Sequence, residues 1–338
     1  MQIMYYDNKE KTLSEIFGTE KILLGEDYLL VGDRKYPVID DVIILAEPEE
    51  YTDAVQMNLV GGNFKKRNGD TNGFSRDVQF TFGREWEQYS GIMNEHKEEF
   101  QQYFDIVDID SLRGRRVCDL GCGMGRFSYF LKDVCRELIL VDFSDSIFVA
   151  RKNLSGADNC LFFMCDLRNI PFAENFADFL FCLGVLHHLP SPALKEARKL
   201  GKFSRRILIY LYYALDNRPV YFRFILAVVT ALRLRMSKIK NPVFRKIMPL
   251  AGAYCIYFPL VLLGEFLKPF GLASFVPLYD SYRGKGLKRI EQDVYDRFFT
   301  PIEQRFSKKE ILQMNDTFEK ITISDKVPYW HFLCRSKN

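Results

Sequence analysis

Short apolar runs alternate with helical stretches along the chain from Arg115 to about residue 212. The apolar runs are nearly uninterrupted, which is typical of strands buried on both faces of a parallel sheet. The pattern therefore predicts a Rossmann-like α/β fold with helices on both faces of a mostly parallel sheet. The predicted strands lie in RRVCDL, ELILVD, CLFFMCD, ADFLFCLG and RRILIYLY, and the predicted helices begin in GRFSYFLKDV, SDSIFVARKNL and SPALKEARKL.

The segments before this core carry other patterns. Residues 21–45 alternate apolar runs with turn residues, which predicts a small β-meander with turns at Gly25–Asp27 and at Gly32 and Asp33. Residues 47–77 are polar and rich in Gly and Asn, which is typical of a linker or loop. Residues 80–104 have aromatic and apolar positions at helical spacing, so a helix is expected there.

The segments after the fifth strand complete the predicted fold. Residues 212–290 are apolar, basic and helical in pattern, and they interrupt the strand rhythm. Ser307 and Glu310 have capping-box spacing, and the strand patterns FEKITISD and YWHFLCRS follow. The expected organisation is a β-rich appendage over 1–50, a linker over 51–79, and a seven-stranded domain over 80–338 with a helical insertion at about 212–290.

Composition adds two limits. The 338 residues are 48% hydrophobic and carry a formal net charge of +3, which allows a large core and argues against nucleic acid as a partner of the whole chain. None of the eight cysteines forms a C-x-x-C pair, so buried free thiols and no metal site are expected. The N-terminal residues do not resemble a signal peptide, and with reduced thiols this predicts a cytoplasmic location.

A glycine-rich segment follows the first strand of the core. Gly121, Gly123 and Gly125 occupy alternate positions between a predicted strand and a predicted helix, where glycine lets a ligand approach the backbone. Several classes of nucleotide-binding protein share this G-x-G pattern. Asp119 precedes it, and a carboxylate there suits an ammonium group and would repel a pyrophosphate. Asp119 and the missing G-x-G-x-x-G spacing argue against a nicotinamide-dependent oxidoreductase.

Two further acids end the next two strands. Asp142 suits the hydroxyl groups of a ribose, and Asp166 can accept a hydrogen bond from an adenine amino group. A single aspartate at a strand end is usually a turn or helix-cap residue. Three such acids at successive strand ends, beside a glycine loop, instead predict one ligand crevice at the carboxyl edge of the sheet.

These residues resemble a known family. VCDLGCGMGRFSYFL, LVDFSD and MCDLRNIPFAENFADFLFCLGVLHHL are similar to class I S-adenosylmethionine-dependent methyltransferases of the small-molecule type (methyltransferase type 11-like). The resemblance is strong over about residues 80–210 and weak over 295–335. The related YPVIDD segment at Tyr36–Asp41 often belongs to a zinc ribbon, but no cysteine precedes Cys118. KLGKFSRR replaces the usual P-G-G turn before the fifth strand.

The resemblance implies S-adenosylmethionine as the cofactor and assigns its contacts. It implies that the amino acid end of the cofactor meets the glycine loop, the ribose meets Asp142, and the adenine meets the residues after the second and third strands. Leu183 and Gly184 would line the sulfonium end. The implied cofactor-binding residues are Asp119, Gly121, Cys122, Gly123, Asp142, Phe143, Asp166, Leu167 and Leu183.

Methyl transfer to a hydroxyl also needs a base. His187, His188, Tyr210 and Tyr212 are the candidates near the carboxyl ends of the strands, and the sequence does not choose among them. Structural histidines near the pocket mouth are the plainer interpretation of the pair. Trp86 and Tyr89 either close over the cofactor or pack in the core.

The helical insertion is the expected source of substrate specificity. Lys202–Gly264 contains eleven basic residues and one acid, Asp216, and Ile247–Gly264 has no charge over eighteen residues. A helical lid over the active site is one interpretation, and contact with an anionic membrane or a lipid-like substrate is another. A phosphorylated or nucleic-acid substrate is a third. The overall expectation is a methyltransferase acting on a small-molecule or lipid-like acceptor, and the alternative is a noncatalytic partner or membrane adaptor protein.

Overall fold

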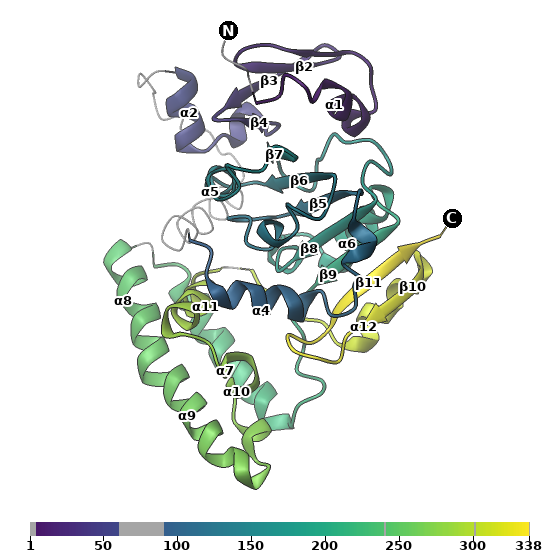
Figure 1. Ribbon diagram of the computed structural model, residues 1–338. Coiled ribbons are helices and arrows are strands. Elements are labelled where there is room, and N and C mark those ends of the chain that lie inside the picture. The colour runs from purple at the N-terminus through teal and green to yellow at the C-terminus, as the bar shows by residue number, and fades with distance from the viewer. Residues whose placement is uncertain (1–4, 61–90, 240, 301, 338) are drawn as a thin grey trace.

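A computed structural model describes residues 5–60, 91–239, 241–300 and 302–337. Its strands form one continuous sheet in the order β1-β2-β3-β4-β7-β6-β5-β8-β9-β11-β10 (Figure 1). The strands are β1 (Ile22–Leu24), β2 (Tyr28–Val31), β3 (Arg34–Ile39), β4 (Val42–Ile44), β5 (Arg116–Leu120), β6 (Glu137–Asp142), β7 (Cys160–Met164), β8 (Phe179–Leu183), β9 (Arg206–Tyr210), β10 (Phe318–Ile323) and β11 (His331–Ser336).

The centre of the sheet is parallel and buried. Strands β7, β6, β5, β8 and β9 pair in parallel, and every residue of β5, β7 and β8 is buried, as their continuous apolar sequences predict. β11 runs antiparallel between β9 and β10. The predicted Rossmann-like, mostly parallel sheet is confirmed, and each of the seven strands from β5 to β11 lies within its predicted segment.

The N-terminal strands extend this sheet. β1, β2, β3 and β4 form the antiparallel meander expected from their turn residues. β4 then pairs in parallel with β7, where Ile43 lies opposite Phe163. Tyr6 fixes the meander to the core, since its hydroxyl donates to the Asp41 carbonyl and accepts from the Phe162 amide. The meander therefore belongs to the same sheet as the parallel strands β5 to β9.

Helices cover both faces of the sheet and bury two apolar clusters. One face packs against α1 (Glu10–Phe17), α6 (Ala193–Lys199) and α12 (Lys308–Leu312). The other face packs against α2 (Asp53–Val60), α4 (Asn94–Tyr103) and α5 (Ser146–Asn153). The predicted capping box of α12 is confirmed, because Ser307 and Glu310 each bond the backbone amide of the other.

Three local predictions differ from the structure. The chain after the glycine loop is a 3₁₀ turn at Ser128–Phe130 flanked by other turns, so the helix predicted there is wrong. Helix α2 occupies part of the segment predicted to be a loop, and α1 was not predicted at all. Of the helix predicted over 80–104, α4 is described, whereas Trp86, Tyr89 and most of the predicted linker lie outside the described residues.

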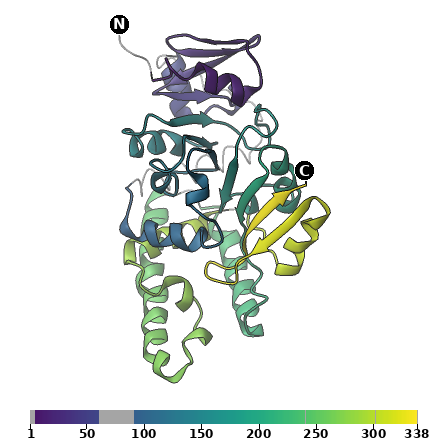
Figure 2. The same ribbon diagram turned by 45° about the vertical axis from the view of Figure 1, so that its right-hand side comes forward.

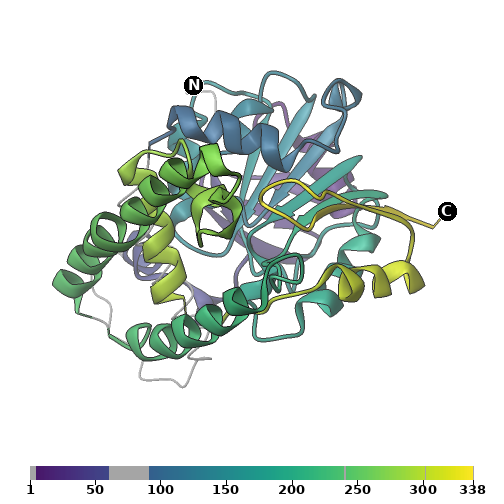
Figure 3. The same ribbon diagram turned by 90° about the horizontal axis from the view of Figure 1, so that it is seen from below.

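The helical insertion projects from the sheet on the side opposite to β1–β3 (Figures 1 and 2). It contains α7 (Val220–Met236), α8 (Pro242–Gly252), a π-helical turn (Ala253–Tyr257), α9 (Phe258–Leu267), α10 (Tyr279–Tyr282) and α11 (Leu287–Phe299). The helix from α8 through α9 is continuous, and its α8 and π-helical parts pack along α11, which also contacts α7. Seen from below, α11 lies between these two long helices and the core (Figure 3). α11 is therefore the element that connects the insertion to the cofactor edge of the sheet.

Candidate active site

The glycine loop turns back over the ends of β5 and β6. Gly121 has φ +76°, and a Cβ atom there would lie 2.4 Å from the Val185 side chain, so this position requires glycine. The amides of Gly121 and Cys122 donate to the Val141 carbonyl at 2.7 and 3.1 Å. Gly125 has φ +76° as well and packs against α5. The loop is thus held by backbone contacts and exposes Gly121 and Gly123 to the pocket.

Asp142 fastens this loop to the end of β6. One carboxylate oxygen accepts from the Gly123 amide at 2.8 Å, and the other accepts from the amide and hydroxyl of Ser144 at 2.9 and 2.8 Å. A carboxylate offers about four acceptor positions, so these three bonds leave capacity for a ligand hydroxyl. Asp142 therefore shapes the loop and still faces the pocket.

Asp119 lies at the bottom of the pocket. Its side chain is buried, and one oxygen accepts from the Ser128 hydroxyl at 2.7 Å. Burial raises the pKa of Asp119 to about 7; the Ser128 hydrogen bond opposes this rise and the Asp142 carboxylate adds to it. An ammonium group placed beside Asp119 would favour its ionised form. The site is accordingly suited to a cationic ligand group.

Asp166 follows β7 and also lines the pocket, but its partner was not predicted. Both of its oxygens accept from the Arg168 guanidinium, with the Arg168 Nε atom at 3.0 and 2.9 Å. The Arg168 amide donates to the same carboxylate at 2.9 Å. Arg168 lies only two positions after Asp166 in the chain, and this local ion pair holds the Asp166 carboxylate in one orientation.

One pocket collects the predicted cofactor residues. All nine line it together: Asp119, Gly121, Cys122, Gly123, Asp142, Phe143, Asp166, Leu167 and Leu183. Parallel pairing explains this result, because the carboxyl ends of β5, β6, β7 and β8 meet at the same sheet edge. Gly184, with φ +80°, lines the same pocket after β8.

The four predicted base candidates lie in different surroundings. His188, Tyr210 and Tyr212 line the pocket, whereas His187 is fully buried and stacks on the Tyr212 ring at 3.9 Å between centroids. Burial lowers the pKa of His187 well below its usual value and raises the pKa of Tyr210 and Tyr212. The Tyr212 hydroxyl donates to Asp296 at 2.7 Å, and a ring nitrogen of His188 bonds the Ile302 carbonyl at 2.8 Å.

The far side of the pocket comes from the helical insertion. Glu99 on α4 is buried. Its carboxylate forms ion pairs with Arg289 at 2.7 Å, Lys285 at 2.9 Å and Arg126 at 3.5 Å. Burial alone would raise the pKa of Glu99, but these three cations outweigh it and hold the pKa well below its usual range. Arg289 also pairs with Asp293 one helical turn further along α11. Glu99 thereby links the core to the insertion.

Arg297 differs from the other cations of the pocket. Arg126, Lys285, Arg289 and Arg305 each pair with an acid. Arg297 lines the pocket without a hydrogen bond or ion pair to any described residue. Glu303 acts on Arg297 electrostatically from beyond ion-pair distance, and a half-buried guanidinium without a direct ion-pair partner favours an anionic ligand group. A helical lid over the active site was one interpretation of the insertion, but none of the pocket residues on α11 was predicted, because α11 is 160 or more residues from the glycine loop in the chain.

The fold and the pocket together define a Rossmann-like α/β protein that binds a nucleoside-type ligand at the carboxyl edge of its sheet. Residues 118–204 match the family model described as a methyltransferase domain. The chain therefore carries a class I methyltransferase domain, and S-adenosylmethionine is the methyl donor of this class, as the sequence predicted. The matched segment runs from β5 to the turn before β9 and contains all nine predicted cofactor residues.

Two characterised relatives match part of the chain. The tRNA (carboxymethyluridine(34)-5-O)-methyltransferase alkbh8 of Xenopus tropicalis is 29% identical over 106 residues, which cover 30% of this chain and 16% of that protein. The tRNA U34 carboxymethyltransferase of Campylobacter curvus is 30% identical over 94 residues, which cover 26% of this chain and 31% of that protein. The match thus spans about a sixth and a third of the lengths of these relatives.

Two solved structures are similar to parts of this chain. The PH0226 protein of Pyrococcus horikoshii OT3 is 14% identical with a TM-score of 0.42, over 72% of this chain and 92% of that chain. The phosphoethanolamine N-methyltransferase 1 of Haemonchus contortus is 19% identical with a TM-score of 0.33, over 43% of this chain and 34% of that chain.

Proposed function

We propose that this protein transfers a methyl group from S-adenosylmethionine to a small-molecule or lipid-like acceptor that carries an anionic group. The observation that supports the proposal is the division of one pocket into two halves. The first half contains the glycine loop and the three strand-end acids, and the second half is formed by α4, α11 and the unpaired Arg297. The first half suits the cofactor and the second half suits an acceptor.

The cofactor is proposed to lie along the strand ends. Asp119 receives its ammonium group, Asp142 receives the ribose hydroxyls, and Asp166 with Leu167 meets the adenine edge. Leu183 then borders the sulfonium, and this orientation directs the methyl group toward the second half of the pocket. Geometry supports this order, because Asp119, Asp142 and Asp166 lie at the carboxyl ends of three neighbouring strands, β5, β6 and β7.

Methyl transfer needs positioning more than acid–base chemistry. The acceptor atom forms a bond to the methyl carbon as the carbon–sulfur bond breaks, and orientation of the two reactants contributes on the order of 7–11 kcal/mol. Where the acceptor is a hydroxyl, His188 is the proposed base, because it lines the pocket. Tyr210 and Tyr212 are proposed to orient the acceptor, since their raised pKa keeps them protonated. His187 is proposed to support Tyr212 from behind.

The anionic group is proposed to bind Arg297. A carboxylate or phosphate beside this guanidinium would supply the direct ion-pair partner that no described residue provides. Tyr282 lines the same side of the pocket and is buried, so its hydroxyl offers an additional donor. Both residues belong to the helical insertion, which therefore determines the acceptor in this proposal.

Nucleic acid is a second candidate acceptor because both relatives are named as tRNA methyltransferases. The two interpretations differ in a direct assay. The full-length protein is incubated with methyl-labelled S-adenosylmethionine and, separately, a metabolite extract, a lipid extract and total tRNA. The proposal predicts label in the metabolite or lipid fraction. Label confined to tRNA would contradict the acceptor class, and cofactor binding without label in any fraction would favour the noncatalytic alternative.

A variant isolates the anionic contact once a labelled acceptor is found. Arg297→Gln is expected to raise the KM for the acceptor about tenfold or more and to leave S-adenosylhomocysteine binding unchanged, because a charge-assisted hydrogen bond contributes roughly 1.5–3 kcal/mol. Arg335→Gln, at an exposed arginine on β11, is the matched control. An unchanged KM for Arg297→Gln would refute the anionic contact while leaving the methyltransferase assignment intact.

A further inference from the structure

The long helix of the insertion has an apolar outer face. Residues at spacings of three and four along Pro242–Phe270 form one stripe, and all of them are exposed. The stripe consists of Val243, Ile247, Leu250, Tyr254, Phe258, Leu262, Phe266 and Phe270. At 1.5 Å per residue this helix is about 40 Å long. A solvated helix normally places charged residues on this face, so the stripe needs another explanation.

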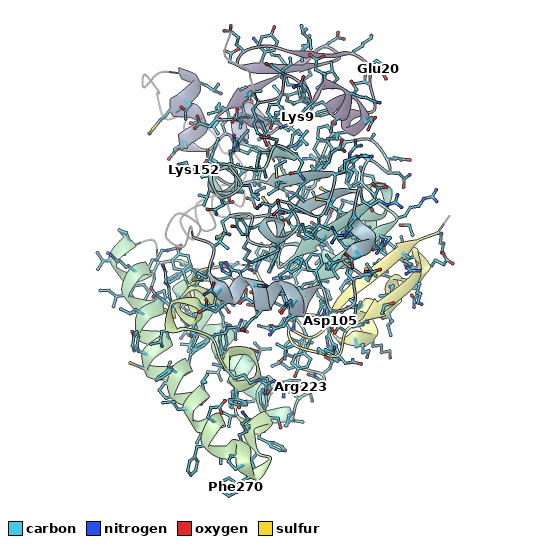
Figure 4. The ribbon with its side chains drawn as sticks, viewed as in Figure 1. Lys9, Glu20, Asp105, Lys152, Arg223 and Phe270 are labelled. Carbon is cyan, nitrogen blue, oxygen red and sulfur yellow. The ribbon has the colours of Figure 1, made fainter. Side chains whose placement is uncertain are left out.

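The far end of the insertion continues this apolar surface. Phe266 and Phe270 are 70% and 68% exposed, and Phe275 follows them in the next turn. Across from them, Val220 and Phe224 at the start of α7 are 70% and 71% exposed. Figure 4 shows Phe270 at the extreme lower end of the molecule, with Arg223 of α7 on the same side of the sheet. The Tyr221 hydroxyl of α7 donates to the Phe275 carbonyl, so exposed apolar side chains of both helices gather at this end of the insertion.

The opposite face of the long helix packs against the rest of the insertion. Gly252 packs against Val294 of α11, and Gly264 packs against Tyr279 so closely that a Cβ atom would lie 2.1 Å from its ring. Tyr257 and Val261 are buried in the same contact. The helix is long and apolar enough to cross a membrane by composition, but one face is packed along its length. This arrangement suits a helix lying in a membrane surface better than one crossing it.

The net charge of residues 217–275 indicates which kind of surface these helices can bind. Residues 217–275 contain nine basic residues and one acid, Glu265, which gives +8, so the remainder of the chain carries −5. Arg223, Lys246 and Lys268 are exposed and each is adjacent to, or two residues from, an exposed apolar side chain. Two copies of such a segment would repel each other. An anionic surface instead complements both its charge and its apolar stripe.

We propose that the α7 and α8–α9 helices dock this protein on an anionic lipid bilayer, with the apolar stripe in the interfacial layer and the exposed basic side chains at the lipid headgroups. This docking does not depend on the chemistry of the pocket. It would bring the α11 side of the pocket close to the bilayer, because α11 packs against both docking helices.

Vesicle flotation tests the docking directly. The full-length protein is mixed with vesicles of phosphatidylcholine alone or with one quarter phosphatidylglycerol, at low and high salt. We expect flotation with the anionic vesicles, at least tenfold less with the neutral vesicles, and release by high salt. Equal flotation of the protein with neutral and anionic vesicles, or no flotation with either, would overturn the proposal.

Two pairs of variants assign the contact to the insertion. Two double variants are expected to lower the binding of the protein to anionic vesicles about tenfold or more. One is Phe266→Ser with Phe270→Ser, and the other is Lys246→Glu with Lys268→Glu. The matched controls change an exposed apolar residue and an exposed lysine elsewhere, Met57→Ser and Lys11→Glu, and should bind as the parent protein does. Thermal unfolding confirms that all four variants are folded. Unchanged binding by both insertion variants, or a concentration-dependent dimer that the phenylalanine variant disrupts, would contradict bilayer docking.

Discussion

Replacing Gly121 by alanine tests the close packing of the cofactor loop. Two costs arise at this position. The backbone at φ +76° costs an L-residue about 1–2 kcal/mol. The new Cβ atom would lie 2.4 and 2.8 Å from the two γ-carbons of Val185, and overpacking of this kind costs about 1–3 kcal/mol. Alanine also lowers the conformational entropy of the unfolded chain relative to glycine, which offsets about 0.4–1 kcal/mol of this loss of stability. The expected loss in the free energy of unfolding is about 2–4 kcal/mol.

Gly32→Ala is the matched control for this substitution. Gly32 has φ +61° in the turn between β2 and β3, but nothing lies within 4 Å of its Cβ position. Urea unfolding followed by circular dichroism should show a loss of about 1 kcal/mol for the control. Calorimetry with S-adenosylhomocysteine should show weaker binding only for Gly121→Ala. Equal losses of stability in the two variants would refute the steric argument about Val185.

Two other predictions concern buried charges. Because burial raises the pKa of Asp119 to about 7, and an ammonium ligand needs the ionised form, S-adenosylhomocysteine affinity should fall about fivefold from pH 7 to pH 6 by calorimetry. The same shift makes the folded protein bind the proton more tightly, so this group stabilises the fold less as the pH rises from about 4 to 7. Asp119→Asn should flatten the pH dependence of affinity, and a slope that persists in that variant would argue for another group. Glu99→Gln removes the buried carboxylate charge that Arg289 and Lys285 share, while Arg289 keeps Asp293, and should cost about 1.5–3 kcal/mol of stability, with faster hydrogen exchange in α11; the exposed neighbour Glu98→Gln should do neither.

The cofactor half of the pocket was predictable because local rules determine it. Continuous apolar runs fix buried parallel strands, and parallel pairing places residues that follow those strands at one edge. Asp119, Asp142 and Asp166 therefore meet although the chain separates them by about 23 residues each time. The helix expected after the glycine loop was wrong, because the periodicity of a short aromatic-rich segment does not separate an α-helix from successive 3₁₀ turns.

The acceptor half could not be predicted, because it depends on long-range packing. Glu99 lies 190 residues before Arg289, and the sequence carries no spacing that links them. The unpaired state of Arg297 is also a property of its surroundings alone. By contrast, the excess of basic residues in the insertion was visible in the sequence. The exposure of its apolar stripe was not, since the same periodicity would suit a helix packed against a core.

Calorimetric titration of S-adenosylhomocysteine tests the central claim most directly. The parent protein should bind with measurable heat, and Asp142→Ala should weaken binding at least about tenfold, because the charge-assisted hydrogen bond that its remaining acceptor position offers a ligand hydroxyl contributes roughly 1.5–3 kcal/mol. Asp158→Ala, at an exposed acid outside the pocket, should bind normally. Absence of heat from folded parent protein, or unchanged affinity in folded Asp142→Ala, would contradict the assignment of this pocket to S-adenosylmethionine.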